Sequence, residues 1–185
     1  MKGQTQTLHY LRDQGHAWDE VTCKGAAFGG QLEMLKWLRS KGVPWDERSC
    51  EGAADRGHLD VLKWARSHGC PWDESACAGA AFGGHLEILK WLRSEGCPWD
   101  EGTCSMAAMG IGDEILKWLR SQDPPCPWDY STPDAAAFSG NVFALEYAVE
   151  NGCDFDPDAC MDEAEENDDG SEGYEWVMTF RDKYL

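Results

Sequence analysis

Cysteine is the residue type whose number and spacing in this sequence could support chemistry. The chain has 185 residues and nine cysteines, and segments such as GCPWDEGTC hold two of them. Thiolates bind metal ions or exchange disulfides, but structural metal sites usually place paired cysteines about two to four residues apart. Here the cysteines form two columns that recur along the chain, and Val43 and Pro133 replace cysteine in them. These exchanges would destroy a ligand or redox pair, so we predict reduced, buried cysteines that pack as small apolar residues. The first column is Cys23, Cys50, Cys77, Cys104 and Cys160, and the second is Cys70, Cys97, Cys126 and Cys153.

Histidine gives no better indication of catalysis. His58 and His85 occupy equivalent places, where Gln31 and Asn141 stand in other copies of the pattern. All of these side chains form hydrogen bonds, so we predict a role in a turn. The sequence has no Ser-His-Asp order, phosphate loop, dinucleotide fingerprint or HExxH helix. We therefore expect a protein that is not an enzyme, with no cofactor and no metal site.

One acidic segment keeps a metal-binding alternative open. DFDPDACMDEAE, from Asp154 to Glu165, places Asp at positions 1, 3, 5 and 9 and Glu at position 12, as in an EF-hand calcium loop. Position 6, which requires Gly for a sharp turn, is Ala159, and Pro157 stands at position 4. The alternative function is thus a calcium- or metal-binding protein that uses the acidic C-terminal segment.

Composition restricts the partners and the compartment. The 34 acidic and 16 basic side chains give a net charge of −18, which repels phosphate backbones and anionic lipid headgroups. We therefore expect a protein partner, with no nucleic acid and no membrane, and a monomeric chain. The N-terminal MKGQTQTLHY lacks the apolar segment of a signal peptide. Together with nine cysteines expected to be reduced, this predicts an intracellular protein, cytoplasmic or nuclear, that is not secreted.

The tryptophans show that the chain is a repeat. One set recurs every 27 residues and a second set keeps the same spacing, which is the signature of a solenoid of stacked units. The first set is Trp18, Trp45, Trp72 and Trp99, and the second is Trp37, Trp64, Trp91 and Trp118. We interpret both sets as packing between units, the alternative being a ligand stack. The predicted single domain, 1–185, has an N-terminal half-unit cap (1–17), repeats at 18–44, 45–71, 72–98, 99–127 and 128–154, and an acidic C-terminal capping unit (155–185).

Each unit predicts two helices. In AAFGGHLEILKWLRSEG, Leu86, Leu89 and Leu92 form an apolar stripe at helical spacing, and Gly96 provides a left-handed stop. The preceding short helix starts either at the Asp of the Trp-Asp-Glu motif or about three residues later, because both places carry capping residues. The fold class is therefore an all-α solenoid of stacked helix-turn-helix units.

The first helix of each unit has one constant and one variable side. Cys23, Ala26 and Ala27 lie on the constant side, where small residues allow a neighbouring helix to come close. The other side varies between units, so we predict that it is exposed and binds the partner. The predicted binding row consists of Val21, Lys24, Phe28, Arg48, Glu51, Asp55, Phe82, Ser105, Met109, Asp134 and Phe138.

The segments AAFGGHLEILKWLRSEG, AADRGHLDVLKWARSHG and AAFGGQLEMLKWLRSKG resemble the ankyrin repeat. The resemblance is to a short variant, because ankyrin units have about 33 residues and begin with Thr-Pro-Leu-His, of which only Thr132-Pro133 remains. The fourth unit departs further, with Ile111-Gly112 where Gly84-His85 is expected. The resemblance implies a curved helical stack that binds proteins, has no catalytic residues, and uses the residue after each Ala-Ala pair.

Overall fold

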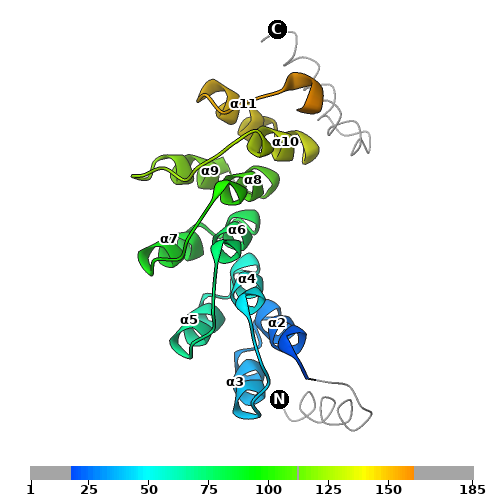
Figure 1. The fold of residues 1–185 in the computed structure, drawn as a ribbon, viewed down its shortest axis with the longest axis vertical. Helices are drawn as coiled ribbons and strands as arrows, with labels where there is room; N and C mark the ends of the chain where they lie inside the picture. Colours follow the sequence, from blue (N-terminus) through cyan, green and yellow to red (C-terminus); the bar gives the residue numbers. More distant parts are fainter. Residues whose placement is uncertain (1–17, 112, 161–185) are drawn as a thin grey trace.

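The computed structural model describes residues 18–111 and 113–160, and this part of the chain is a stack of five helix pairs without strands (Figure 1). The predicted all-α helical-repeat solenoid is confirmed. The first helices are α2 (Glu20–Phe28), α4 (Glu47–Asp55), α6 (Glu74–Phe82), α8 (Glu101–Met109) and α10 (Ser131–Phe138). The second helices are α3 (Leu32–Ser40), α5 (Leu59–Ser67), α7 (Leu86–Ser94), α9 (Asp113–Arg120) and α11 (Val142–Glu150).

Aspartate sets the start of the first helices. The Asp19 carboxylate accepts a hydrogen bond from the Thr22 amide (3.3 Å), and Asp73 accepts one from the Ser75 amide (3.1 Å). Both satisfy amides that a helix start leaves without a partner. Four of the first helices thus begin directly after the Asp, which decides between the two predicted starts, while α10 begins two residues after Asp129. At the other end of α7, Gly96 has the expected left-handed conformation, with φ 79°.

The two helices of a unit belong to two different columns. The first helices lie side by side on the inner side of the curved stack, and the second helices lie on its outer side (Figure 1). In α6 the buried side chains are small, among them Cys77 and Ala80, whereas α7 buries Leu89 and Leu92. Small side chains allow helices to approach closely and large ones hold them apart. The first helices accordingly pack along their length and the second helices scarcely touch, which curves the stack.

The tryptophans join the two columns. Trp72 and Trp91 of one unit meet edge to face at 5.9 Å. Equivalent pairs recur in the other described units, and in the fifth of them Tyr147 is the partner of Trp128. The Arg66 guanidinium of the preceding unit lies 4.1 Å from the Trp72 ring, and Arg93 lies 3.8 Å from Trp99. These tryptophans are half-buried against the core. The structure therefore places them between units, as the packing interpretation expects.

All nine cysteines are buried. The Cys97 thiol donates a hydrogen bond to the Asp73 carbonyl at 3.3 Å, and its contact with Cys77, together with burial, raises its pKa. Burial also raises the pKa of the Cys23 thiol to about 11 and that of Cys153 to about 12. A thiol held protonated is a poor nucleophile and a poor metal ligand, which agrees with the expected packing role.

The proposed calcium loop is described only in its first half. The Asp156 carboxylate accepts hydrogen bonds from the amides of Asp158 (3.0 Å) and Ala159 (3.4 Å), and helical residues follow from Pro157 to Cys160. Asp156 thus caps a helix start as Asp19 does. The rest of the segment, the 1–17 cap and most of the C-terminal cap lie outside the described residues. Over 18–111 and 113–160, no three His, Cys, Asp or Glu side chains gather as a metal site would require, and no helix is long and apolar enough to cross a membrane.

Candidate partner-binding surface

The predicted binding row lies on the inner column and is largely open to solvent. Its most exposed apolar side chains are Val21 (58% exposed), Phe82 (43%), Phe28 (38%) and Phe138 (38%). Arg48 is exposed as well, and five further members are half-buried: Lys24, Glu51, Asp55, Met109 and Asp134. The packing side of the same helices is closed, with Cys23 and Ala27 at 0% exposure. The division of each first helix into a packing side and an open side is thus as predicted.

Ser105 is the exception, because it is buried and not exposed as the row requires. Only 6% of the residue is accessible, and its hydroxyl lies 2.6 Å from the Ser131 hydroxyl of the next unit. It also donates a hydrogen bond to the Glu101 carbonyl at 3.3 Å. The contact between α8 and α10 therefore closes over this position, and Ser105 joins two units instead of facing a partner.

Charged side chains of the inner column are concentrated around α2 and α4, where Val21 and Phe28 are exposed as well. The charged residues there are Lys24, Arg48, Glu51, Asp55 and Arg56. The Arg48 guanidinium forms an ion pair at 2.6 Å with Asp46, a residue that is not part of the binding row. The Arg56 guanidinium forms an ion pair with Asp55 at 3.3 Å and lies 4.1 Å from the centre of the Phe28 ring. Further along, the row consists mainly of apolar side chains. These two parts of the row meet between α4 and α6.

A first groove, which we call the helix groove, occupies this boundary. It has a volume of about 380 Å³ and runs across α4, α6 and α8. Its lining combines two acidic residues of α4, small residues of α6 and the apolar residues Phe82 and Met106. Its lining residues are Glu51, Asp55, Ser75, Ala78, Gly79, Phe82 and Met106.

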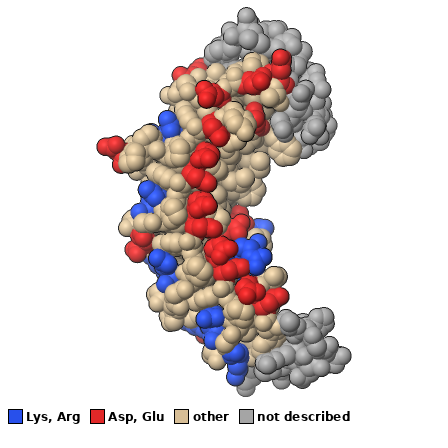
Figure 2. Space-filling view, in the orientation of Figure 1, with Lys and Arg blue, Asp and Glu red and all other residues tan. Residues whose placement is uncertain are grey.

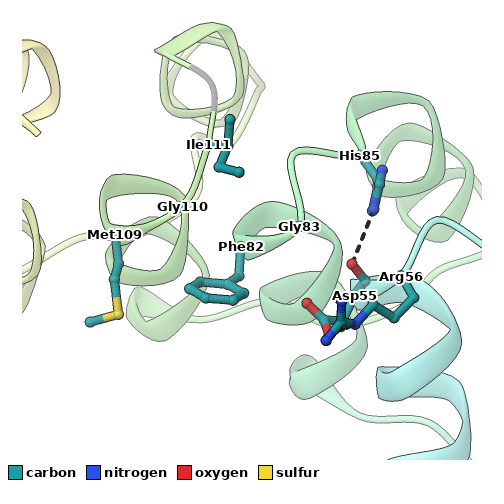
Figure 3. A pocket seen from close by; sticks show the side chains of 8 residues that line it. All are labelled: Asp55, Arg56, Phe82, Gly83, His85, Met109, Gly110 and Ile111. Atoms are coloured by element: carbon teal, nitrogen blue, oxygen red, sulfur yellow. Dashed lines mark hydrogen bonds and ion pairs between the residues drawn. The ribbon is translucent and has the colours of Figure 1, made fainter. Parts of the chain in front are cut away.

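A second groove, the turn groove, lies beside the helix groove where the first helices end (Figure 3). It has a volume of about 390 Å³ and shares Asp55 and Phe82 with the helix groove. Its lining residues are Asp55, Arg56, Phe82, Gly83, His85, Met109, Gly110 and Ile111. The two grooves thus adjoin along the Phe82 side chain.

The turn groove lies where the histidine pattern stops. The His58 ring packs against Gly30 and the His85 ring against Gly57, so closely that a Cβ at Gly57 would lie 2.8 Å from the imidazole. His85 Nε2 also lies 3.0 Å from the Asp55 carbonyl oxygen. No histidine ring of the next unit packs against Gly84. The atom nearest to a Cβ added at Gly84 would be the Ile111 carbonyl oxygen, at 2.6 Å. The Ile111 side chain next to it is 83% exposed.

Sequence reasoning missed several residues of these grooves. Arg56, His85 and Ile111 were not among the predicted binding residues, although all three line the turn groove. The signal was present in the departure of the fourth unit, where Ile111-Gly112 replaces Gly84-His85. This departure places Ile111 in the lining of the turn groove, which a pattern of exposed positions does not show.

Figure 2 shows how charge is distributed over one face of the molecule. Asp and Glu side chains form a band along the face that it shows, and many of the Lys and Arg side chains lie to one side of this band. Four first helices begin with Glu directly after Asp, for example at Asp73-Glu74. Net charge is thus unevenly distributed, and it does not describe any one face.

No protein family and no curated protein matches the sequence. Among solved structures, the pentatricopeptide repeat protein PPR10 in complex with an 18-nt psaJ RNA element is similar with a TM-score of 0.54 and 14% identity. This similarity covers 87% of the present chain, which spans only 27% of the PPR10 chain. A chain from the complex of the predatory endopeptidase Bd0816 from Bdellovibrio bacteriovorus with immunity protein Bd3460 is also similar (TM-score 0.50, 18% identity, 85% and 96% covered). These similarities show that the chain has a helical-repeat solenoid fold.

The same comparison corrects the expectation of no nucleic acid. That exclusion rested on net charge alone, and it is wrong because PPR10, the RNA-bound protein of the comparison, has a similar helical-repeat architecture. Local charge at a binding surface decides which polymer can approach it, whereas net charge averages over all faces. The nature of the partner therefore has to be argued from the groove residues.

Proposed function

We propose that the chain is a non-catalytic binding scaffold, an ankyrin-like adaptor that holds a segment of a partner protein along its inner column. The observation that carries the proposal is the exposed Phe82 side chain between two adjoining grooves. Exposed aromatic residues in a concave surface are typical anchors of protein interfaces. Phe28 and Phe138 extend this surface along neighbouring units.

A protein segment suits the helix groove because of its lining residues. Glu51 and Asp55 line this groove together with the apolar residues Phe82 and Met106. A polypeptide can offer basic and apolar side chains side by side, whereas the phosphates of RNA would meet the two carboxylates. RNA remains the competing ligand, since the similar PPR10 structure contains it.

The test compares the unaltered chain with the variant Phe28→Ser, Phe82→Ser, Phe138→Ser. Peptides are selected from a displayed library of random 12-residue sequences, and their affinities are measured by fluorescence anisotropy. We expect the triple variant to bind at least about tenfold more weakly, because interface aromatic residues contribute more than about 1 kcal/mol each. Its melting temperature should change little, because all three rings are partly exposed.

The matched control is Tyr130→Ser, which removes an aromatic side chain that is 62% exposed and lines neither groove. It should bind the selected peptides as the unaltered chain does. A labelled pool of random single-stranded RNA is titrated in parallel. Failure to select peptides, equal affinity of the triple variant, or saturable RNA binding that this variant loses would each overturn the proposal.

A further inference from the structure

Guanidinium groups cover aromatic rings throughout the described part of the molecule. Four cover tryptophans between units, with distances from the guanidinium carbon to the ring centre between 3.8 and 4.2 Å. These pairs are Arg39–Trp45, Arg66–Trp72, Arg93–Trp99 and Arg120–Trp128. A cation over an aromatic face is attracted by the charge distribution of the ring. The fold thus uses one pairing repeatedly, always within its own chain.

On the inner column, Arg56 does the same for Phe28. Its guanidinium lies 4.1 Å from the ring of Phe28 and pairs with the Asp55 carboxylate at 3.3 Å. One arginine therefore joins an aromatic face of one unit to a carboxylate of the next. The inner column thus already holds one guanidinium between an aromatic ring and a carboxylate.

Phe82 is the equivalent of Phe28 two units later, and no cation of residues 18–111 and 113–160 covers its ring. The position that corresponds to Arg56 is Gly110. A Cβ at Gly110 would lie 2.4 Å from the Phe82 carbonyl oxygen, so no side chain can stand there without a shift of the backbone. The close approach of the two turns therefore leaves the Phe82 ring open to a ligand.

Two acidic residues line the helix groove together with Phe82. Glu51 and Asp55 are one helical turn apart in α4, so both lie on the same side of that helix. Asp55 pairs with Arg56, whereas Glu51 forms no ion pair within the described parts of the chain. A carboxylate without a cation thus shares a groove with an aromatic ring without a cation.

We propose that the helix groove binds an arginine side chain of the partner protein. The guanidinium lies over Phe82 and pairs with Glu51, and the aliphatic stem packs on Ala78 and Met106. Arginine suits the site better than lysine because its planar group stacks on rings and binds carboxylates through two hydrogen bonds. This inference rests on the proposed function, since it names the side chain that anchors the protein segment.

The experiment uses the peptides selected from the 12-residue library on the full chain. We expect an arginine common to the selected sequences. Replacement of this arginine by citrulline, which keeps the shape and removes the charge, should weaken binding about tenfold, and replacement by lysine should weaken it less. The variant Glu51→Gln should weaken the arginine peptide severalfold and leave the citrulline peptide unchanged. The charge-matched control Glu87→Gln, on the outer helix α7, should affect neither peptide.

Three results would overturn this inference, and the first of them separates it from the proposed function. Peptides that lose affinity for the Phe82→Ser chain but bind equally well with arginine or citrulline would overturn the arginine anchor and leave the scaffold function standing. Selected peptides that bind the Phe28→Ser, Phe82→Ser, Phe138→Ser chain with full affinity would overturn both. RNA that competes with the arginine peptide and binds more tightly at the same salt concentration would identify nucleic acid as the ligand and overturn both as well.

Discussion

The inner and outer helices of each unit bury side chains of different size. The inner column is closed by small side chains such as Ala80, so that its helices touch, while the outer column is filled by Leu89 and its equivalents. The inner-helix side chains that point away from the helix–helix contact can vary between units without a loss of packing in the core. The comparison teaches that curvature and binding surface have one cause, the small size of the inner packing residues.

The outer column should be sensitive to lost volume. The Leu89 side chain has 0% exposure, and Leu89→Ala should lower the free energy of unfolding by about 3 kcal/mol, because a buried cavity adds to the lost transfer energy. Urea denaturation followed by circular dichroism measures the change. Lys90→Ala, on the exposed side of the same helix, should cost little. Equal losses for both variants would contradict the assignment of the outer core.

The inner column should be sensitive to added volume. Ala80 is fully buried where α6 faces its neighbours, so Ala80→Leu should lower the free energy of unfolding by about 2 kcal/mol through overpacking. The control Ala78→Leu adds the same volume on the groove side of α6 and should leave the unfolding free energy nearly unchanged. If Ala78→Leu were the more damaging change, the two sides of the inner helices would be wrongly assigned.

The buried thiols should make the inner column sensitive to alkaline pH. The Cys23 pKa is raised to about 11, above the ordinary value of 9.0, so this thiol stays protonated when folded and ionises when unfolded. The contribution of the Cys23 thiol to the free energy of unfolding is fully present below pH 9 and is lost as the pH rises toward 11. Between pH 8 and pH 10, the free energy of unfolding should therefore fall by about 1 kcal/mol less in Cys23→Ala than in the unaltered chain, as measured by urea denaturation at each pH.

The matched control for this titration is Ala27→Gly, which removes a buried methyl group of the same helix and keeps every thiol. It should lower stability at each pH and keep the pH dependence of the unaltered chain. An identical pH dependence in Cys23→Ala and Ala27→Gly would show that the Cys23 thiol ionises equally in both states.

The periodic features of this fold could be predicted from sequence. The 27-residue spacing of the tryptophans gave the units, and the small residues around Cys23 gave the packing side. These features are repeated several times, so chance variation in one unit does not hide them. The sequence allowed two starting positions for the first helices, and the hydrogen bonds that Asp19 and Asp73 accept from helix amides show which position is capped.

The features that occur once could not be predicted in the same way. The burial of Ser105 depends on a contact between its hydroxyl and that of Ser131, 26 residues away in the next unit. The open Phe82 face depends on Gly110, which stands at the position of Arg56 two units earlier. A repeat pattern describes the side chains that the units share, so it does not show what a single departure exposes.

The pairing of each arginine with the next tryptophan has a consequence for how such a chain can change length. If the unit 72–98 were excised, Arg66 would meet Trp99 in the place where it now meets Trp72, and the new junction would join residues of the same types. Duplication of a unit would preserve the junctions equally well. Whole units can therefore enter or leave the gene without a compensating mutation in the core, while the excision would delete Phe82 and with it the anchor of the binding surface.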